Sequence, residues 1–230
     1  ANLGFISNSN GIDNEIEILS AQDLATQAVI DMKCYVNYYH KGTFKDQLVY
    51  KEQEVNVDLD LAHLKKLNAP IKLKIEKDGN QYLVTGSYYI PVDAFSSEKE
   101  PVKIEKTLAS LPASINTRVG TLSFTKNGNF KLKDGESLKA IIVSPDMAAS
   151  GYAKALAVSQ TSKTTTIAEL VLKDEDPQRS IDYLNTLIKV YNRQANEDKN
   201  EISFRTEQFI NQRLEKINNE LGNTEGQLES

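Results

Sequence analysis

Two aspartates, Asp58 and Asp60, have the spacing that best suggests chemistry. They stand two residues apart in the run 48–61, where apolar and polar residues alternate as in a β-strand, so both carboxylates are expected on one strand face. A carboxylate pair is the minimum set of groups for glycoside hydrolysis. The same spacing is typical of the solvated face of a strand, and no apolar surroundings are predicted that would raise one pKa. We therefore expect a strand surface and no catalytic residue.

Other residues that could bind metal or react are few. Neither His40 nor His63 has a second histidine or a cysteine at metal-ligand spacing. The single cysteine, Cys34, excludes an intramolecular disulfide and is expected as a small core residue. The sequence contains no phosphate-binding glycine loop, nucleophile elbow or zinc-protease helix. We expect neither a metal ion nor a cofactor.

The 10 tyrosines, in a chain without tryptophan, are a weak indication of carbohydrate binding. Tyr38, Tyr39, Tyr88 and Tyr89 lie in strand-like segments, where aromatic residues are favoured in any case. A carbohydrate-binding module therefore stays an alternative, and it would place tyrosines in an open groove.

The composition narrows the class of protein. With 230 residues, 40% of them hydrophobic, the chain can bury a sizeable core. Its 32 acidic and 27 basic residues give a net charge of −5, which provides no basic face and makes nucleic acid an improbable partner. The apolar runs are far shorter than the roughly 20 residues that cross a bilayer. No basic stretch followed by an apolar run opens the chain, so we expect a cytosolic protein or a piece of a larger one.

The expected elements indicate an α+β fold. Apolar residues recur at threes and fours over residues 13–32, which predicts two short helices with a kink at Ser20, and a further helix is expected from Pro145 to about Ala155. The turn 78–80 between two alternating runs predicts a hairpin. Strands are expected at residues 35–40, 48–61 with a bulge at 52–54, 71–77, 81–89, 102–106, 121–126, 130–133, and on both sides of 162–166.

A long C-terminal helix is expected to begin at Pro177, after acidic residues that suit the helix dipole. No proline or glycine follows before Gly222, so the helix would be about 65 Å long, against a radius of gyration near 17 Å for a compact domain of this size. We therefore expect it to project from its domain. Its apolar residues follow a seven-residue repeat that slips by one position after Phe209: Ile181, Leu184, Ile188, Tyr191, Ala195, Ile202 and Phe209, then Ile210, Leu214, Ile217, Leu221 and Leu228.

The polar section of this helix, residues 192–208, has two interpretations. It is either a solvated helix held by local ion pairs, with Glu197 and Glu201 beside Lys199 and Arg205, or a hydrated subunit interface. The sequence stops at Ser230 within the helical pattern, so we expect a partner helix to follow in a longer protein. On that expectation the isolated chain is mostly monomeric in dilute solution.

Three stretches resemble one family. "DNEIEILSAQDLATQAVIDM" (13–32) is similar to the helix pair that opens the extracytoplasmic domain of bacterial polysaccharide chain-length determinants, the polysaccharide co-polymerases. "AASGYAKALAVSQTSKTTTIAELVLKDEDPQRSIDYLNTLIKVY" (148–191) resembles their helix, paired strands and aspartate-proline helix start, and "FINQRLEKINNELGNTEGQLES" (209–230) resembles the start of their coiled-coil hairpin. Residues 68–138 look like the β-rich insertion of the larger members, the tyrosine kinases of capsule and exopolysaccharide export.

The resemblance implies a mixed α/β base, residues 1–67 and 139–230, that carries the β-rich insertion and a long projecting C-terminal helix. It implies a non-catalytic periplasmic domain whose parent is anchored in the bacterial inner membrane, with any tyrosine kinase in a separate cytoplasmic part. The implied partners are copies of the same chain, a polysaccharide polymerase and an outer-membrane export channel, with the growing polysaccharide as a further candidate.

The residues predicted to form the oligomer interface lie on the first helix and on the C-terminal helix. The alternative for all of them is ordinary solvated charge. A helix-mediated adaptor that binds an unrelated partner also stays open as an alternative function. The predicted interface residues are Asn14, Glu15, Glu17, Arg193, Arg205 and Arg213.

Overall fold

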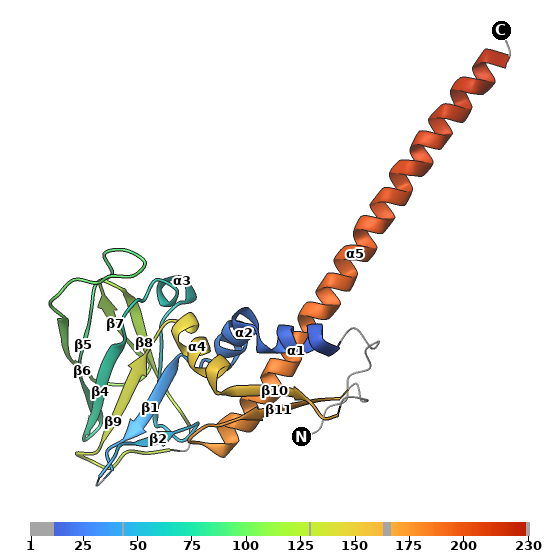
Figure 1. The fold of residues 1–230 in the computed structure, drawn as a ribbon. Helices are drawn as coiled ribbons and strands as arrows, with labels where there is room; N and C mark the ends of the chain where they lie inside the picture. Colours follow the sequence, from blue (N-terminus) through green and yellow to red (C-terminus); the bar gives the residue numbers. More distant parts are fainter. Residues whose placement is uncertain (1–11, 43, 129, 163–166, 229–230) are drawn as a thin grey trace. The chain divides into compact units, whose positions relative to one another are not determined.

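The computed structural model describes residues 12–228 except 43, 129 and 163–166, with side chains described as far as residue 217. It contains helices and several sheets, which confirms the predicted α+β class (Figure 1). Contacts divide the chain into two units, residues 1–187 and 188–230. The sheets of the described chain belong to the first unit, and the second is helical.

The predicted kink near Ser20 is confirmed. Helix α1 (Ile12–Ser20) and helix α2 (Gln22–Met32) are separated by Ala21, whose backbone is extended, and the Ser20 hydroxyl donates to the carbonyl of Ile16. The buried face of α2 packs against helix α4 (Pro145–Ala155). Ser144 caps α4 by accepting a hydrogen bond from the Met147 N–H, and Pro145 suits the first turn.

The larger sheet has six antiparallel strands in the order β2-β1-β9-β4-β5-β6. The predicted hairpin at 78–80 is confirmed, with Gly79 at φ +59 in its turn. Alternate residues of β4, β5 and β9 are buried and face one another across the strands, as in the pairs Ile75–Leu138 and Ile75–Val84. The strands are β1 (Val36–His40), β2 (Gln47–Val49), β4 (Ile71–Asp78), β5 (Gln81–Tyr88), β6 (Val102–Leu108) and β9 (Ser137–Ile142).

A second sheet has three antiparallel strands in the order β3-β8-β7: β3 (Val55–Asp58), β7 (Ala113–Thr117) and β8 (Gly120–Lys126). Two tyrosine hydroxyls of the larger sheet form hydrogen bonds with β3 of this second sheet and with the turn between β7 and β8. Tyr38 accepts from the Val57 N–H at 2.7 Å, and Tyr88 accepts from the Arg118 N–H at 3.1 Å. Both tyrosines are buried, and their hydroxyls connect the two sheets.

The predicted single strand over residues 48–61 is wrong. The chain leaves the larger sheet at Val49 and enters the smaller one at Val55, and the helix α3 (Leu61–Leu64) begins where the strand was expected to end. Lys51, at φ +61, turns the backbone out of strand geometry. The buried Glu54 carboxylate then fixes the crossing, because it bonds to Lys77, Tyr82 and the Leu132 N–H.

One further strand prediction was wrong, two strands were missed, and the two strands predicted on either side of residues 162–166 are confirmed. Residues 130–133 form no strand, since the Leu132 N–H is used by Glu54. Strands β7 and β9 were missed, although β9 lies between β1 and β4. The hairpin β10 (Leu156–Gln160) and β11 (Ala168–Leu172) occurs where two strands were predicted, and the turn between them falls partly outside the described residues.

Residues 68–138, expected as a β-rich insertion, contain β4 to β8 and the start of β9. Their strands do not form a sheet of their own. Both sheets combine them with strands from before residue 68, because β4 joins β1 through β9, and β8 pairs with β3. The predicted insertion therefore shares its core with the base.

The predicted C-terminal helix is present as α5 (Pro177–Leu228), 52 residues long, or about 78 Å. Asp176 caps it by accepting from the Arg179 N–H. Among its side chains described as far as residue 217, the buried ones are Tyr183, Leu187 and Val190, which recur at i, i+4 and i+7. This is a different face from the predicted seven-residue stripe, of which Ile181 is 53% exposed.

Candidate functional site

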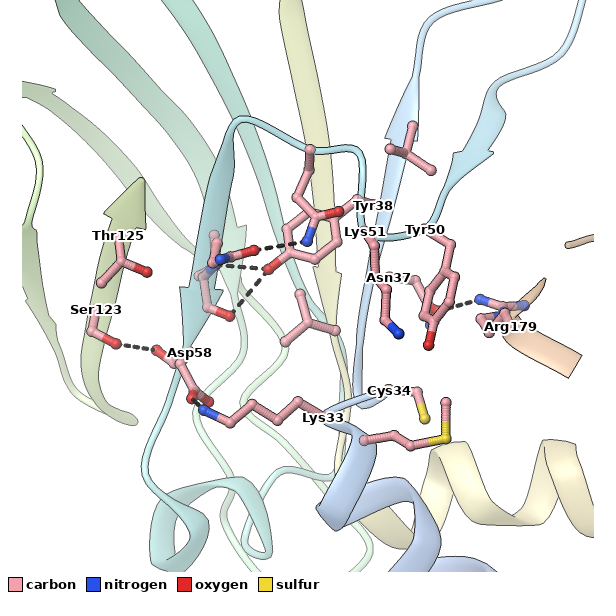
Figure 2. A pocket seen from close by; sticks show the side chains of 16 residues that line it. Lys33, Cys34, Asn37, Tyr38, Tyr50, Lys51, Asp58, Ser123, Thr125 and Arg179 are labelled. Atoms are coloured by element: carbon pink, nitrogen blue, oxygen red, sulfur yellow. Dashed lines mark hydrogen bonds and ion pairs between the residues drawn. The ribbon is translucent and has the colours of Figure 1, made fainter. Parts of the chain in front are cut away.

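A cavity of about 360 Å³ lies within the first unit, where β1 and β2 meet β3 and β8 beside the end of α2 (Figure 2). The crossing segment, residues 50–54, contributes three of its lining residues. The cavity therefore exists because the chain crosses between the sheets at the residues where the sequence predicted a bulge. Its lining residues are Met32, Lys33, Cys34, Val36, Asn37, Tyr38, Val49, Tyr50, Lys51, Gln53, Asn56, Val57, Asp58, Ser123, Thr125 and Arg179.

Asp58 and Asp60 do not form a carboxylate pair. Lys33 reaches from the end of α2 to Asp58 (Figure 2), and the distance between Lys33 Nζ and Asp58 Oδ2 is 2.6 Å. Asp58 also accepts from the Tyr35 hydroxyl at 2.8 Å. Asp60 instead caps α3 by accepting from the His63 N–H, and it contacts the His63 ring at 2.6 Å. Asp58 therefore lies in the wall of the cavity, whereas Asp60 caps helix α3.

Asp182 forms the second ion pair beside the cavity. It accepts from Lys51 at 2.5 Å and from the Tyr50 hydroxyl at 2.7 Å. The Lys51 bond, followed by the Tyr50 bond, lowers the pKa of Asp182 to about 2. This pair anchors the crossing segment to α5 within the first unit.

Asp182→Asn is expected to lower the free energy of unfolding by about 1 kcal/mol at pH 7, because Lys51 is mostly exposed and solvent screens the pair. A carboxylate whose pKa is depressed on folding stabilises above its unfolded pKa, and that stability is lost as the pH falls through the folded value. The difference between variant and wild type should therefore shrink from about pH 4 toward pH 2. Urea unfolding at each pH measures it, with the exposed Asp198→Asn as the control, and a difference that persists at pH 2 would contradict the assignment.

Arg179, at the start of α5, forms the most buried ion pair near the cavity. Its Nε donates to Asp174 at 2.6 Å, a second nitrogen donates to the same carboxylate, and Nη1 donates to Asn37 at 2.9 Å. Burial opposes the charged guanidinium, but Asp174 outweighs it and raises the pKa of Arg179. Asp174, which was expected to interact favourably with the dipole of the C-terminal helix, therefore also orients Arg179.

Cys34 is buried, as predicted, and its sulfur is 3.9 Å from the Val29 carbonyl oxygen. Burial raises the pKa of its thiol to about 11, so the thiolate nucleophile is scarce at neutral pH. Among the described residues, no three His, Cys, Asp or Glu side chains come together as a metal site. These observations assign Cys34 to the core.

A second candidate surface is the helical face of α5 beyond Ala195. Every side chain from 196 to 217 is exposed. At 100° per residue, five apolar residues fall on a face about 140° wide. These are Ile202, Phe209, Ile210, Leu214 and Ile217, each between 43% and 65% exposed. We call this set the apolar face of α5.

The predicted interface residues fall in both units. Asn14 and Glu17 are exposed on α1, and Glu15 is half-buried there. On α5, helix geometry places Arg213 within the apolar face, between Phe209 and Ile217. Arg205 falls at its edge and pairs with Glu201, as the solvated-helix interpretation predicted.

Arg193 falls on the opposite side of α5, so the three arginines do not share one face. They extend over about 30 Å of helix. No feature of the described residues brings Arg193 to the apolar face.

Sequence analysis singled out Asp58, Tyr38 and Cys34 among the cavity-lining residues, and it missed the others. In the sequence, the polar residues Lys51, Gln53 and Asn56 resemble an interruption of one strand. Alternation of polar and apolar residues does not reveal that the chain crosses there from one sheet to another. The signal in the sequence that could have indicated the crossing is the polar cluster 51–54, which interrupts a run of alternating apolar and polar residues.

The sequence matches no protein-family model and no curated protein. Within the described part of the chain, no helix is both long enough and apolar enough for a membrane span.

Proposed function

We propose that this chain is a non-catalytic periplasmic scaffold domain of a polysaccharide co-polymerase, part of a parent protein anchored in the bacterial inner membrane. In this proposal the domain assembles with copies of itself and helps to control the chain length and export of a capsular or exopolysaccharide. A polysaccharide polymerase and an outer-membrane export channel are the proposed partners. A tyrosine kinase, where the parent has one, is a separate cytoplasmic part.

The apolar face of α5 is the observation that carries the proposal. Ile202 and Phe209 are 65% and 64% exposed, on a section of helix whose other side chains are mostly polar. An isolated polar helix of this length is poorly stabilised, because most helical stability comes from packing an amphipathic face. A second helix that packs on this face would remove the exposed side chains from water and extend the seven-residue pattern.

The element order supports the same proposal. Two short helices open the described chain, and a helix, a two-stranded hairpin and a long helix follow one another at its end. This is the order that the resemblance to chain-length determinants implies. The assignment of function from such an order is an analogy at the level of fold, so it needs a direct test.

The test is made in the parent protein in its own host. Ile210→Glu is expected to shift the length distribution of the surface polysaccharide on gels and to reduce the size of the detergent-solubilised assembly, because it places a charge within the apolar face. Gln208→Glu is the matched control, since this exposed residue adds the same charge two positions earlier, on the side of the helix opposite the apolar face.

An unchanged polysaccharide and an unchanged assembly in the Ile210→Glu strain would overturn the proposal. A lost assembly with normal polysaccharide would favour the helix-mediated adaptor instead. An equal effect of Ile210→Glu and Gln208→Glu would show that charge anywhere on the helix is harmful, and would also count against it.

A further inference from the structure

The cavity between the two sheets has balanced charge. Its three cationic residues each pair with a carboxylate: Lys33 with Asp58, Lys51 with Asp182, and Arg179 with Asp174. The rest of the lining is uncharged, and its hydrogen-bonding groups are amides and hydroxyls, on Asn37, Gln53, Asn56, Ser123 and Thr125 among others. A site with paired charges and many neutral donors and acceptors suits an uncharged polar ligand better than a phosphate or a metal ion.

Gln53 supplies an independent indication of a ligand. This residue is 8% exposed and lines the cavity, and its Nε2 donates to Asn56 at 2.7 Å. Its Oε1 is buried and has no hydrogen-bond partner among the residues that the structure describes. A buried acceptor without a donor costs about 1–3 kcal/mol, so the native state gains if a bound hydroxyl donates to it.

Two tyrosine rings complete the lining. Tyr38 is held by its hydroxyl to the Val57 backbone, and Tyr50 is held by its hydroxyl to Asp182. Because both hydroxyls are engaged, the rings offer fixed apolar surfaces to the cavity (Figure 2). Such surfaces complement the C–H face of a pyranose ring, whose hydroxyls point outward to the surrounding polar groups.

We propose that this cavity is a binding site for one neutral saccharide unit, with Gln53 Oε1 accepting a hydrogen bond from a sugar hydroxyl. The volume of about 360 Å³ lies at the lower end of the range for small-molecule sites, which suits a single ring rather than an oligosaccharide. The site lies in the first unit and needs no assembly through α5. The proposed saccharide site is therefore independent of the proposed scaffold function, and each can be tested without the other.

The test is ligand-observed saturation-transfer NMR on the whole chain, with glucose, galactose, mannose and N-acetylglucosamine as neutral probes and glucuronate and glucose 6-phosphate as anionic probes. At least one neutral probe is expected to bind with millimolar affinity and more tightly than its anionic counterpart. Gln53→Leu, which removes the acceptor, should weaken that binding about tenfold or more.

Val49→Phe is the second variant, because it fills the cavity from β2 without removing a polar contact, and it should also abolish binding. Gln47→Leu, an exposed change on the same strand, is the matched control and should bind as wild type does. Circular dichroism establishes that each variant is folded. Absence of binding by every neutral probe, tighter binding of the anionic probes, or equal binding by wild type and both cavity variants would each overturn the proposal.

Discussion

Tyr183→Ala is expected to lower the free energy of unfolding by about 4 kcal/mol, whereas Tyr183→Phe is expected to raise it by about 1 kcal/mol. Tyr183 is fully buried on α5 and stacks on Tyr152, with ring centroids 4.2 Å apart. Truncation would leave a large void and remove the stacked pair. The Tyr183 hydroxyl, however, is buried and has no hydrogen-bond partner in the described part of the chain, so phenylalanine removes the cost of burying it and keeps the packing.

Urea unfolding monitored by circular dichroism measures both changes. Ile181→Ala is the control, since this residue lies two positions earlier on the same helix and is 53% exposed, and it should cost less than about 1 kcal/mol. The two Tyr183 variants must move the midpoint in opposite directions. A loss of stability in Tyr183→Phe would mean that the hydroxyl has a partner in solution.

Glu54→Ala is expected to lower the free energy of unfolding by about 3 kcal/mol. The Glu54 carboxylate is completely buried and accepts from Lys77 at 2.9 Å, from the Tyr82 hydroxyl at 2.6 Å and from the Leu132 N–H. Burial by itself disfavours the charged form, but these bonds outweigh it and lower the pKa of Glu54. Removal of the carboxylate leaves the tyrosine, the backbone N–H and a mostly buried lysine without their acceptor.

Glu52→Ala gives the matched comparison, because Glu52 belongs to the same crossing segment and is exposed. It should change the free energy of unfolding by less than about 0.5 kcal/mol. Glu54→Gln should fall between the two, since the amide oxygen still accepts but carries no charge. Equal stabilities of the Glu52 and Glu54 alanine variants would show that the carboxylate does not hold the crossing.

Local sequence patterns predicted the elements whose partners are close in the chain. The helix start at Pro177, the turn at Gly79 and the kink near Ser20 each depend on neighbouring residues, and each is confirmed. Strand alternation failed at residues 48–61, because it records which residues are buried and not which sheet buries them. The partners of Glu54 are 23 to 78 residues away, so no local pattern revealed them.

The site was less predictable than the fold. Sequence analysis selected Asp58 for its spacing from Asp60, but the structure assigns Asp58 to the cavity for another reason, its ion pair with Lys33. Gln53 carried no recognisable motif, because an unpartnered amide oxygen is a property of packing. Along α5 the seven-residue pattern did identify an apolar stripe, while the face that is buried, with Tyr183 and Leu187, was overlooked.

The central position of β9 constrains how the domain reaches its native state. This strand pairs with β1 and β4, and the pairing of Val36 with Ile142 joins residues separated by more than 100 positions. Such distant pairings slow folding, because a long loop must close before the contacts form. During synthesis β1 can pair with β2 early, but the other edge of β1 has no strand beside it until β9, at residues 137–142, has emerged.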